Sequence, residues 1–137
     1  MLNLRHMKKE EIEEKAAQAA ELRKKGLRNC TQAVTEVLAE ETGLSPEIWL
    51  QLSSGFAAGM GSTKATCGSL IGAVMAAGMK KEGKGTVIAA RQISESFEQK
   101  CGALKCMTLK GLDDKGIYTP CEECVRNAVR AYYEVME

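Results

Sequence analysis

The sequence has few aromatic residues and almost no net charge. Only 4% of its 137 residues are aromatic, whereas Ala, Gly and Met are plentiful, which suits close-packed helices better than twisted strands. The 19 Lys and Arg residues are balanced by 18 Asp and Glu residues, so no basic field attracts nucleic acid. A chain of this length can bury one hydrophobic core. We therefore expect a single all-α domain over residues 1–137 and no nucleic-acid partner.

No segment has the features of a membrane span or of an export signal. The longest weakly polar run, from Ala65 to Met79, is shorter than the roughly 20 residues that a spanning helix needs. The residues from Met1 to Glu14 contain no apolar stretch that is followed by a cleavage site. We expect a cytoplasmic protein that does not insert into a membrane.

The near absence of histidine excludes several kinds of chemistry. His6 is the only histidine, and it lies in a terminal segment where no Cys/His nucleophile or histidine metal site is expected. Valine follows Cys124 where covalent haem attachment requires histidine, so we expect no haem. The glycine-rich segment from Gly55 to Gly61 lacks the Lys-Ser/Thr ending of a phosphate-binding P-loop.

Apolar spacing and capping residues predict a bundle of about five or six helices. Asn29 with Gln32 forms a variant capping box, Ser45 precedes a first-turn proline, and Gly26 and Gly102 are stop signals. The expected helices cover residues 8–25, 30–42, 46–54, a segment that begins within 62–66 and runs to about 79, 86–101 and 120–136, with one turn near 104–109.

The pattern of side chains also predicts which residues each helix buries. Trp49 and Leu52 are the expected anchors of the third helix. The helix over 86–101 is expected to bury the face that carries Val87, Ala90 and Phe97, together with Ser94 and Cys101.

Small residues mark the helix that we place at the centre of the bundle. They recur at four-residue spacing in two rows: Ala65, Ser69, Ala73 and Ala77, and Gly68, Gly72 and Ala76. Rows of this kind let neighbouring helices approach closely. If they were exposed, they could also join two copies of the chain in a homodimer.

Six cysteines are the most unusual feature of the composition. A reducing compartment disfavours a disulfide framework, which leaves metal ligation or redox chemistry. Cys30, Cys67 and Cys121 are expected at helix starts, where unpaired N–H groups stabilise a thiolate. Cys124 follows Cys121 by one helical turn, and Cys106 lies in the irregular segment before them, so these thiols could converge. Any one of them could instead be a small buried hydrophobe, and Cys101 is the best candidate for that role.

Two motifs and two further cysteines carry a family resemblance: NCTQAV at residues 29–34, CGSLIGA at residues 67–73, Cys106 and Cys124. They resemble the family of redox-active proteins that is named for its C-G-A-x-x-G motif and four cysteines, and the resemblance covers most of the chain. Ser69 stands where the motif has alanine. The resemblance selects Cys30, Cys67, Cys106 and Cys124 as the functional set and leaves Cys101 and Cys121 without an assigned role.

The same family is similar to the iron–sulfur part of split-Soret-type cytochromes. This similarity implies that Cys30, Cys67, Cys106 and Cys124 bind an iron–sulfur cluster, [2Fe–2S] or related, for electron transfer or sensing, because four thiolates are its usual complement. Two alternatives stay open. One is a thiol–disulfide protein in which Cys30 or Cys67 attacks and Cys124 resolves. The other is a non-catalytic helical interaction module. The sequence names neither the redox partner nor a substrate, and it leaves open whether the protein is an enzyme.

Overall fold

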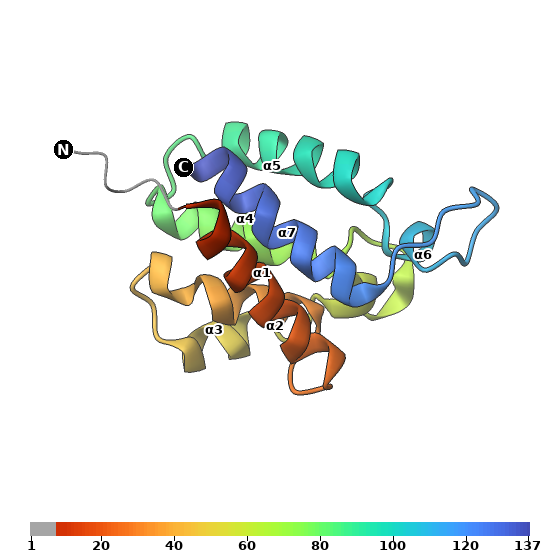
Figure 1. Ribbon diagram of the computed structural model, residues 1–137, viewed down its shortest axis with the longest axis horizontal. Helices are drawn as coiled ribbons and strands as arrows, with labels where there is room; N and C mark the ends of the chain where they lie inside the picture. Colours follow the sequence, from red (N-terminus) through yellow and green to blue (C-terminus); the bar gives the residue numbers. More distant parts are fainter. Residues whose placement is uncertain (1–7) are drawn as a thin grey trace.

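The computed structural model describes residues 8–137, which form a helical bundle (Figure 1). The seven α-helices of this part of the chain are α1 (Lys9–Lys24), α2 (Cys30–Leu38), α3 (Pro46–Leu52), α4 (Gly68–Lys80), α5 (Thr86–Cys101), α6 (Cys106–Leu109) and α7 (Cys121–Met136). A 3₁₀ turn, η1 (Ala39–Glu41), extends α2, and a π-helical turn, η2 (Gly59–Thr63), precedes α4. The prediction of an all-α fold is confirmed. The expectation for His6 lies outside the described residues.

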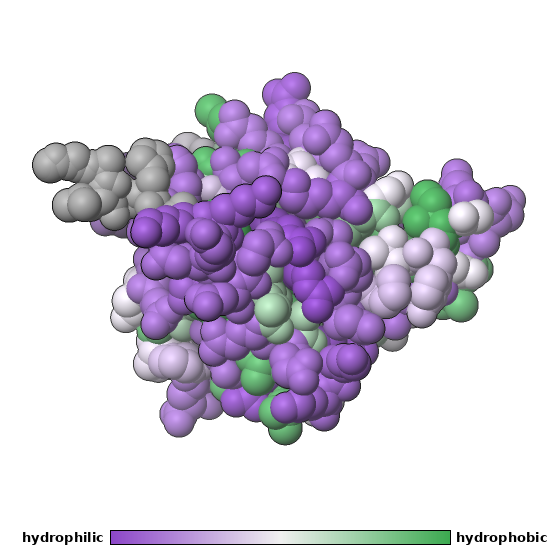
Figure 2. Space-filling view, in the orientation of Figure 1, coloured by the Kyte–Doolittle hydropathy of each residue, from purple (hydrophilic) through white to green (hydrophobic). Residues whose placement is uncertain are grey.

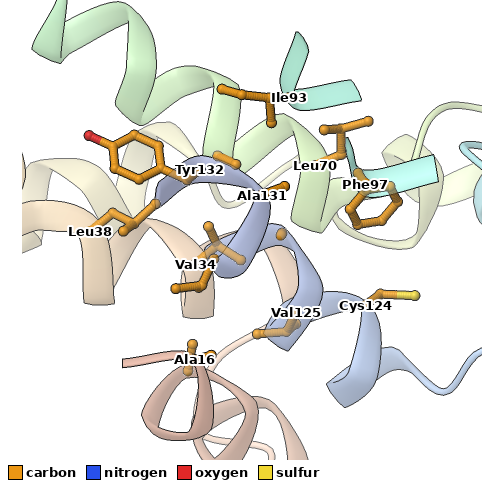
Figure 3. Packing of buried hydrophobic residues seen from close by; sticks show 14 of the residues in the cluster. Ala16, Val34, Leu38, Leu70, Ile93, Phe97, Cys124, Val125, Ala131 and Tyr132 are labelled. Carbon is orange, nitrogen blue, oxygen red and sulfur yellow. The ribbon is translucent and has the colours of Figure 1, made fainter. Parts of the chain in front are cut away.

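Helices α4 and α7 form the centre of the bundle. Helix α7 packs against α1, α2, α4 and α5, and it lies between α1 and α5 in Figure 1. Its buried face includes Val125, Ala128 and Tyr132, which join side chains from α2, α4 and α5 in a single core (Figure 3). The central position predicted for the Ala/Gly-rich helix is therefore confirmed for α4, and α7 shares it.

The two rows of small residues bring α4 against α2. A Cβ atom at Gly72 would lie 3.0 Å from the carbonyl oxygen of Thr31 and 3.2 Å from Cβ of Val34, so the helices meet where a side chain is absent. Six of the small residues are buried inside the molecule: Gly68, Ser69, Gly72, Ala73, Ala76 and Ala77. The rows are therefore not an exposed surface for association, and a homodimer, which stays a prediction, would need another face.

Most of the predicted helix boundaries are confirmed by their capping contacts. The Asn29 side chain accepts a hydrogen bond from the backbone N–H of Gln32 at 2.9 Å, and the Gln32 side chain accepts from the N–H of Asn29. Ser45 caps α3 by accepting from the N–H of Ile48 at 3.3 Å. Gly102 ends α5 in the left-handed conformation, with φ of 98°.

Two helix starts differ from the prediction. Helix α4 is capped by Cys67 itself, because residues 59–63 form the separate turn η2. The sequence Thr119-Pro120-Cys121-Glu122 predicts a capping box in which Thr119 caps the last helix. Helix α7 instead begins at Cys121 after Pro120, and the Thr119 hydroxyl donates to the carbonyl of Cys101 at 2.7 Å. The tertiary contact to α5 replaces the local one.

Two predicted burial patterns are wrong in part, although Trp49, Phe97 and Cys101 are buried as predicted. Leu52 is 56% exposed, so Trp49 alone anchors α3, with its indole N–H donating to the hydroxyl of Thr42 at 2.9 Å. Val87 is 84% exposed, because α5 turns a neighbouring face, with Ala89, Ile93, Ser96 and Phe97, toward the core.

The surface over α1 and α7 is mostly hydrophilic (Figure 2). Arg130 of α7 pairs with Glu13 of α1 through two hydrogen bonds of 2.8 and 2.6 Å, and Lys100 of α5 pairs with Glu134 of α7 at 2.6 Å. These ion pairs join α7 to α1 on one side and to α5 on the other. No helix within residues 8–137 is both long enough and apolar enough to cross a membrane.

Candidate functional site

Five of the six cysteines line one small cavity at an end of the bundle. The cysteines are Cys30, Cys67, Cys106, Cys121 and Cys124. The cavity has a volume of about 20 Å³, which is enough for one water molecule. The starts of α4, α6 and α7 gather at the right-hand end of the bundle in Figure 1. The predicted convergence of thiols is therefore observed. We call these five residues the cysteine cluster.

The cluster is built from helix starts. Cys30, Cys106 and Cys121 are the first residues of α2, α6 and α7, and Cys67 is the N-cap of α4. Cys124 lies one turn into α7, and Figure 3 places it at the end of the hydrophobic core. At the start of α4, the backbone N–H groups of Ser69 and Leu70 favour the ionised form of Cys67.

A short antiparallel pairing holds Cys67 beside Cys106. The N–H of Cys67 donates to the carbonyl of Leu104 at 2.8 Å, and the N–H of Cys106 donates to the carbonyl of Ala65 at 3.0 Å. Thr66 and Lys105 form the isolated bridge between these two bonds. Two cysteines that are 39 positions apart in the sequence are therefore fixed by backbone contacts.

Two glycines allow the cysteine-bearing segments to approach each other. A Cβ atom at Gly68 would lie 2.9 Å from Sγ of Cys30 and 2.8 Å from the carbonyl oxygen of Phe56. A Cβ atom at Gly59 would lie 2.8 Å from Cβ of Cys106. Distances this short are not tolerated between real side chains. The apolar, glycine-rich composition of residues 55–61 predicts that the backbone there passes close to another group. This is confirmed at Gly59, and the neighbour is Cys106 of the cysteine cluster.

Cys30 and Cys121 form the first pair of interacting thiols. A hydrogen bond from the Cys121 thiol is the main reason why the pKa of Cys30 falls to about 6, and the backbone N–H of Ala58 and the Thr31 hydroxyl add to it. Burial and the charge on Cys67 act in the opposite direction. The same hydrogen bond, followed by burial, raises the pKa of Cys121. At neutral pH one sulfur is ionised and its neighbour keeps a proton.

Cys67 and Cys124 form the second pair. A hydrogen bond from the Cys124 thiol is the main cause that lowers the pKa of Cys67 to about 7, against the effect of burial. The Ser69 hydroxyl and the N–H groups of Ser69 and Leu70 also favour the Cys67 thiolate. The Cys124 thiol donates to the carbonyl oxygen of Thr119 at 3.6 Å, and its interactions with the neighbouring Cys101 and Cys67 sulfurs, followed by burial, raise its pKa. Ser69, at the position where the motif has alanine, thus places a buried hydroxyl without a hydrogen-bond partner among residues 8–137 near Cys67.

The remaining thiols have distinct surroundings. Cys101 lies behind Cys124, whose hydrogen bond is the main cause that lowers the pKa of Cys101, and it accepts a hydrogen bond from the Asn127 amide at 3.4 Å. It is buried on α5, as expected of a packing residue, but it also contacts the cluster. Burial is the main cause that raises the pKa of Cys106.

The structure brings together all four cysteines that the resemblance selects, Cys30, Cys67, Cys106 and Cys124, and it adds Cys121. Cys121 was set aside when four positions were carried over from the family pattern. The signals that could have retained it were its place at a helix start and its three-residue spacing from Cys124.

The donor chemistry of the cysteine cluster fits a thiolate-ligated metal site, but the volume of the cavity does not fit a cluster of several atoms. Four thiolates are the usual ligands of an iron–sulfur cluster. A cavity of about 20 Å³ has no room for two irons and their bridging sulfides. Within residues 8–137, no three side chains of the types His, Cys, Asp or Glu are arranged to hold a metal ion.

Comparison with known proteins gives one match. No curated protein and no solved structure matches the chain. A family model matches residues 28–135, which include the cysteine cluster and all helices from α2 to α7. The chain therefore belongs to the C_GCAxxG_C_C family, whose members are described as "putative redox-active protein".

Proposed function

We propose that this protein carries electrons by reversible formation of disulfides within the cysteine cluster, with Cys30 and Cys121 as the principal pair. The observation that carries the proposal is that both thiols line the same small cavity, where a hydrogen bond from Cys121 lowers the pKa of Cys30 and raises that of Cys121. An ionised thiol of this kind is the nucleophile of disulfide exchange.

The reaction balances with a disulfide-containing acceptor. The thiolate of Cys30 and the thiol of Cys121 give up two electrons and one proton and become joined by a disulfide bond. The acceptor disulfide takes up the two electrons and is cleaved to two thiols after it has gained two protons, one from Cys121 and one from water. A thiol donor reverses the reaction.

Cys67 and Cys124 are the second pair in the proposal. They repeat the arrangement of an ionised sulfur beside a protonated one, and they line the same cavity as the first pair. Cys101 also hydrogen-bonds with Cys124. Cys101 could therefore replace Cys67 as the disulfide partner of Cys124. The proposal fits the expected cytoplasmic location, where thiols are returned to the reduced state.

Peptide mapping after mild oxidation tests this function. Reduced protein is treated with diamide, remaining thiols are alkylated, and disulfide-linked peptides are identified by mass spectrometry. We expect a Cys30–Cys121 linkage that dithiothreitol reverses. The Cys121→Ser variant should lose this linkage, whereas the matched variant Cys106→Ser should keep it. Oxidised protein with no Cys30–Cys121 linkage would contradict the proposal.

An iron–sulfur cluster on Cys30, Cys67, Cys106 and Cys124 is the second candidate function. It is favoured by the fact that all four of these thiols line the same cavity. The thiols would have to move apart to admit the cluster. Protein that is reconstituted anaerobically and then contains neither iron nor acid-labile sulfide would reject this candidate, whereas stoichiometric iron and sulfide would favour it over the disulfide mechanism.

A further inference from the structure

A pocket on the surface shares a wall with the cavity of the cysteine cluster. The pocket has a volume of about 490 Å³ and lies beside the loop between α6 and α7. Lys110, Thr119 and Cys121 line both the pocket and the cavity. Tyr118 and Leu112 line the outer part of the pocket and are 71% and 62% exposed. The pocket is thus within the size range of small-molecule sites and leads to the buried thiols.

Cys121 is the only cysteine of the cluster that solvent reaches to a substantial degree. The other four cluster cysteines are between 2% and 6% exposed. Cys121 is half-buried and stands at the shared wall. A reagent that enters the pocket therefore meets the sulfur of Cys121 first.

The charged groups of the pocket suit a ligand that carries both signs of charge. Lys110 and Glu122 line the pocket. Among the ion pairs of residues 8–137, none involves either side chain. The Lys110 ammonium also lies near enough to Cys121 to favour its thiolate. A carboxylate of the ligand could pair with Lys110, and an ammonium group with Glu122.

We infer that Cys121 is the sulfur through which the cluster exchanges electrons with its substrate, and that the surface pocket binds a small thiol or disulfide of the amino-acid or short-peptide class. This inference rests on the proposed disulfide function. The Cys30 thiolate accepts the proton of Cys121, the Cys121 sulfur attacks the substrate disulfide, the substrate S–S bond breaks, and the first substrate thiolate takes that proton from Cys30 as it leaves. The Cys30 thiolate then attacks Sγ of Cys121, the mixed disulfide breaks, and the second substrate thiolate leaves and takes a proton from water.

Trapping of the mixed disulfide tests the role of Cys121, with oxidised glutathione as the probe. In a Cys30→Ser variant the second attack is removed, so we expect glutathione to accumulate on Cys121 at about one per chain. In wild-type protein, limiting iodoacetamide should label Cys121 before the other cluster cysteines, a measurement that needs no variant. Glutathione on Cys67 or Cys106 with Cys121 unmodified, or labelling that begins at a buried cysteine, would overturn the inference.

The same data separate this inference from the proposed function. If diamide produces the Cys30–Cys121 linkage while glutathione is attached elsewhere, only the substrate-facing role of Cys121 fails. If no Cys30–Cys121 linkage forms, the function itself fails.

Lys110 provides the test of the ligand class. The Lys110→Gln variant should react about three- to five-fold more slowly with oxidised glutathione, the effect of one partly exposed charge pair. Its rate with 2-hydroxyethyl disulfide, which carries no charge, should fall less, because only the effect of Lys110 on the Cys121 thiolate is lost there. Lys115→Gln, on the same loop but outside the pocket lining, is the matched control and should leave both rates unchanged. Equal slowing with both disulfides, or none with either, would contradict the proposed ligand class.

Discussion

At the scale of single residues, the cluster depends on positions that have no side chain. Gly68 lets α4 begin against Cys30, and Gly59 lets the preceding turn lie against Cys106. The sequence indicated a close approach at residues 55–61 because glycine is poor in a helix interior and apolar neighbours are unusual in a loop. It did not identify the neighbour, because the contact joins segments that are far apart in the chain.

Substitution of Gly68 should damage the cluster as well as the fold. In Gly68→Ala the new methyl group would meet Sγ of Cys30 and the backbone of Phe56, so we expect a loss of about 1–3 kcal/mol in the free energy of unfolding. Urea denaturation measures the loss. Gly55→Ala is the matched control, since nothing lies within 4 Å of a Cβ atom there, and it should change stability little. Equal stability of the two variants would show that the packing at Gly68 is not tight.

The ionisation of Cys30 should depend on its contact with Cys121. The pKa of Cys30 lies near 6, below the ordinary value of 9.0, so the thiolate should persist above about pH 6 and disappear as the pH falls through that value. The measurement is the ultraviolet absorbance of thiolate against pH, taken as the difference between wild type and Cys30→Ser.

Replacement of the donor should shift this titration upward. In Cys121→Ala the hydrogen bond to the Cys30 thiolate is lost, so its midpoint should move toward 9.0. Cys106→Ala is the matched control and should leave the midpoint near 6. A midpoint that does not move in Cys121→Ala would contradict the pairing of these two sulfurs.

At the scale of helices, capping residues predict where helices begin and end, whereas the sequence does not fully predict which face of a helix is buried. Asn29, Ser45 and Gly102 each end or begin a helix as their chemistry predicts. The buried face of α5 was assigned one step away from the observed face, because its apolar residues fit two neighbouring faces and contact with α7 decides between them. A helix cap depends on four or five adjacent residues, whereas the choice of the buried face depends on how two helices pack against each other.

Loss of the α2 cap should weaken both the helix and the site. In Asn29→Ala the bond to the N–H of Gln32 is lost, which should cost about 1 kcal/mol of stability. Because Cys30 is the next residue, its position should become less defined, and formation of the Cys30–Cys121 linkage with diamide should slow.

The cap of α3 provides the comparison. Ser45→Ala removes an equivalent bond from a helix that carries no cysteine, so it should cost a similar free energy and leave the linkage rate unchanged. If both variants slow the linkage equally, the effect is one of general stability and not of the position of Cys30.

At the scale of the whole molecule, one end of the bundle brings together five cysteines that are spread over nearly a hundred residues of the sequence. The starts of α2, α4, α6 and α7 supply all five thiols of the cluster, and the backbone pairing of residues 65–67 with 104–106 fixes two of them. Helix-start placement and the family resemblance were enough to predict Cys30 and Cys67. The convergence of Cys121 with Cys106 and Cys124 was indicated by its place one turn before Cys124, but its pairing with Cys30 could not be predicted, because the pairing depends on how α2 and α7 cross.

The pocket beside Cys121 is also a product of the whole fold. It is formed by the loop between α6 and α7, which Thr119 ties to the bundle through bonds to the carbonyls of Leu109 and Cys101. No sequence pattern within residues 110–122 predicts a pocket. The substrate-facing role inferred for Cys121 therefore depends on the fold and not on a motif.

The most direct test of the central claim is a redox titration in which free thiols are counted. The protein is equilibrated anaerobically in buffers of reduced and oxidised dithiothreitol or glutathione, quenched by alkylation and mapped by mass spectrometry. We predict that Cys30 and Cys121 lose their thiols together in a reversible two-electron transition, with a slope of about 30 mV per tenfold change in the ratio of oxidised to reduced protein. Thiols that stay free at every potential, or a one-electron transition that accompanies bound iron, would contradict the account.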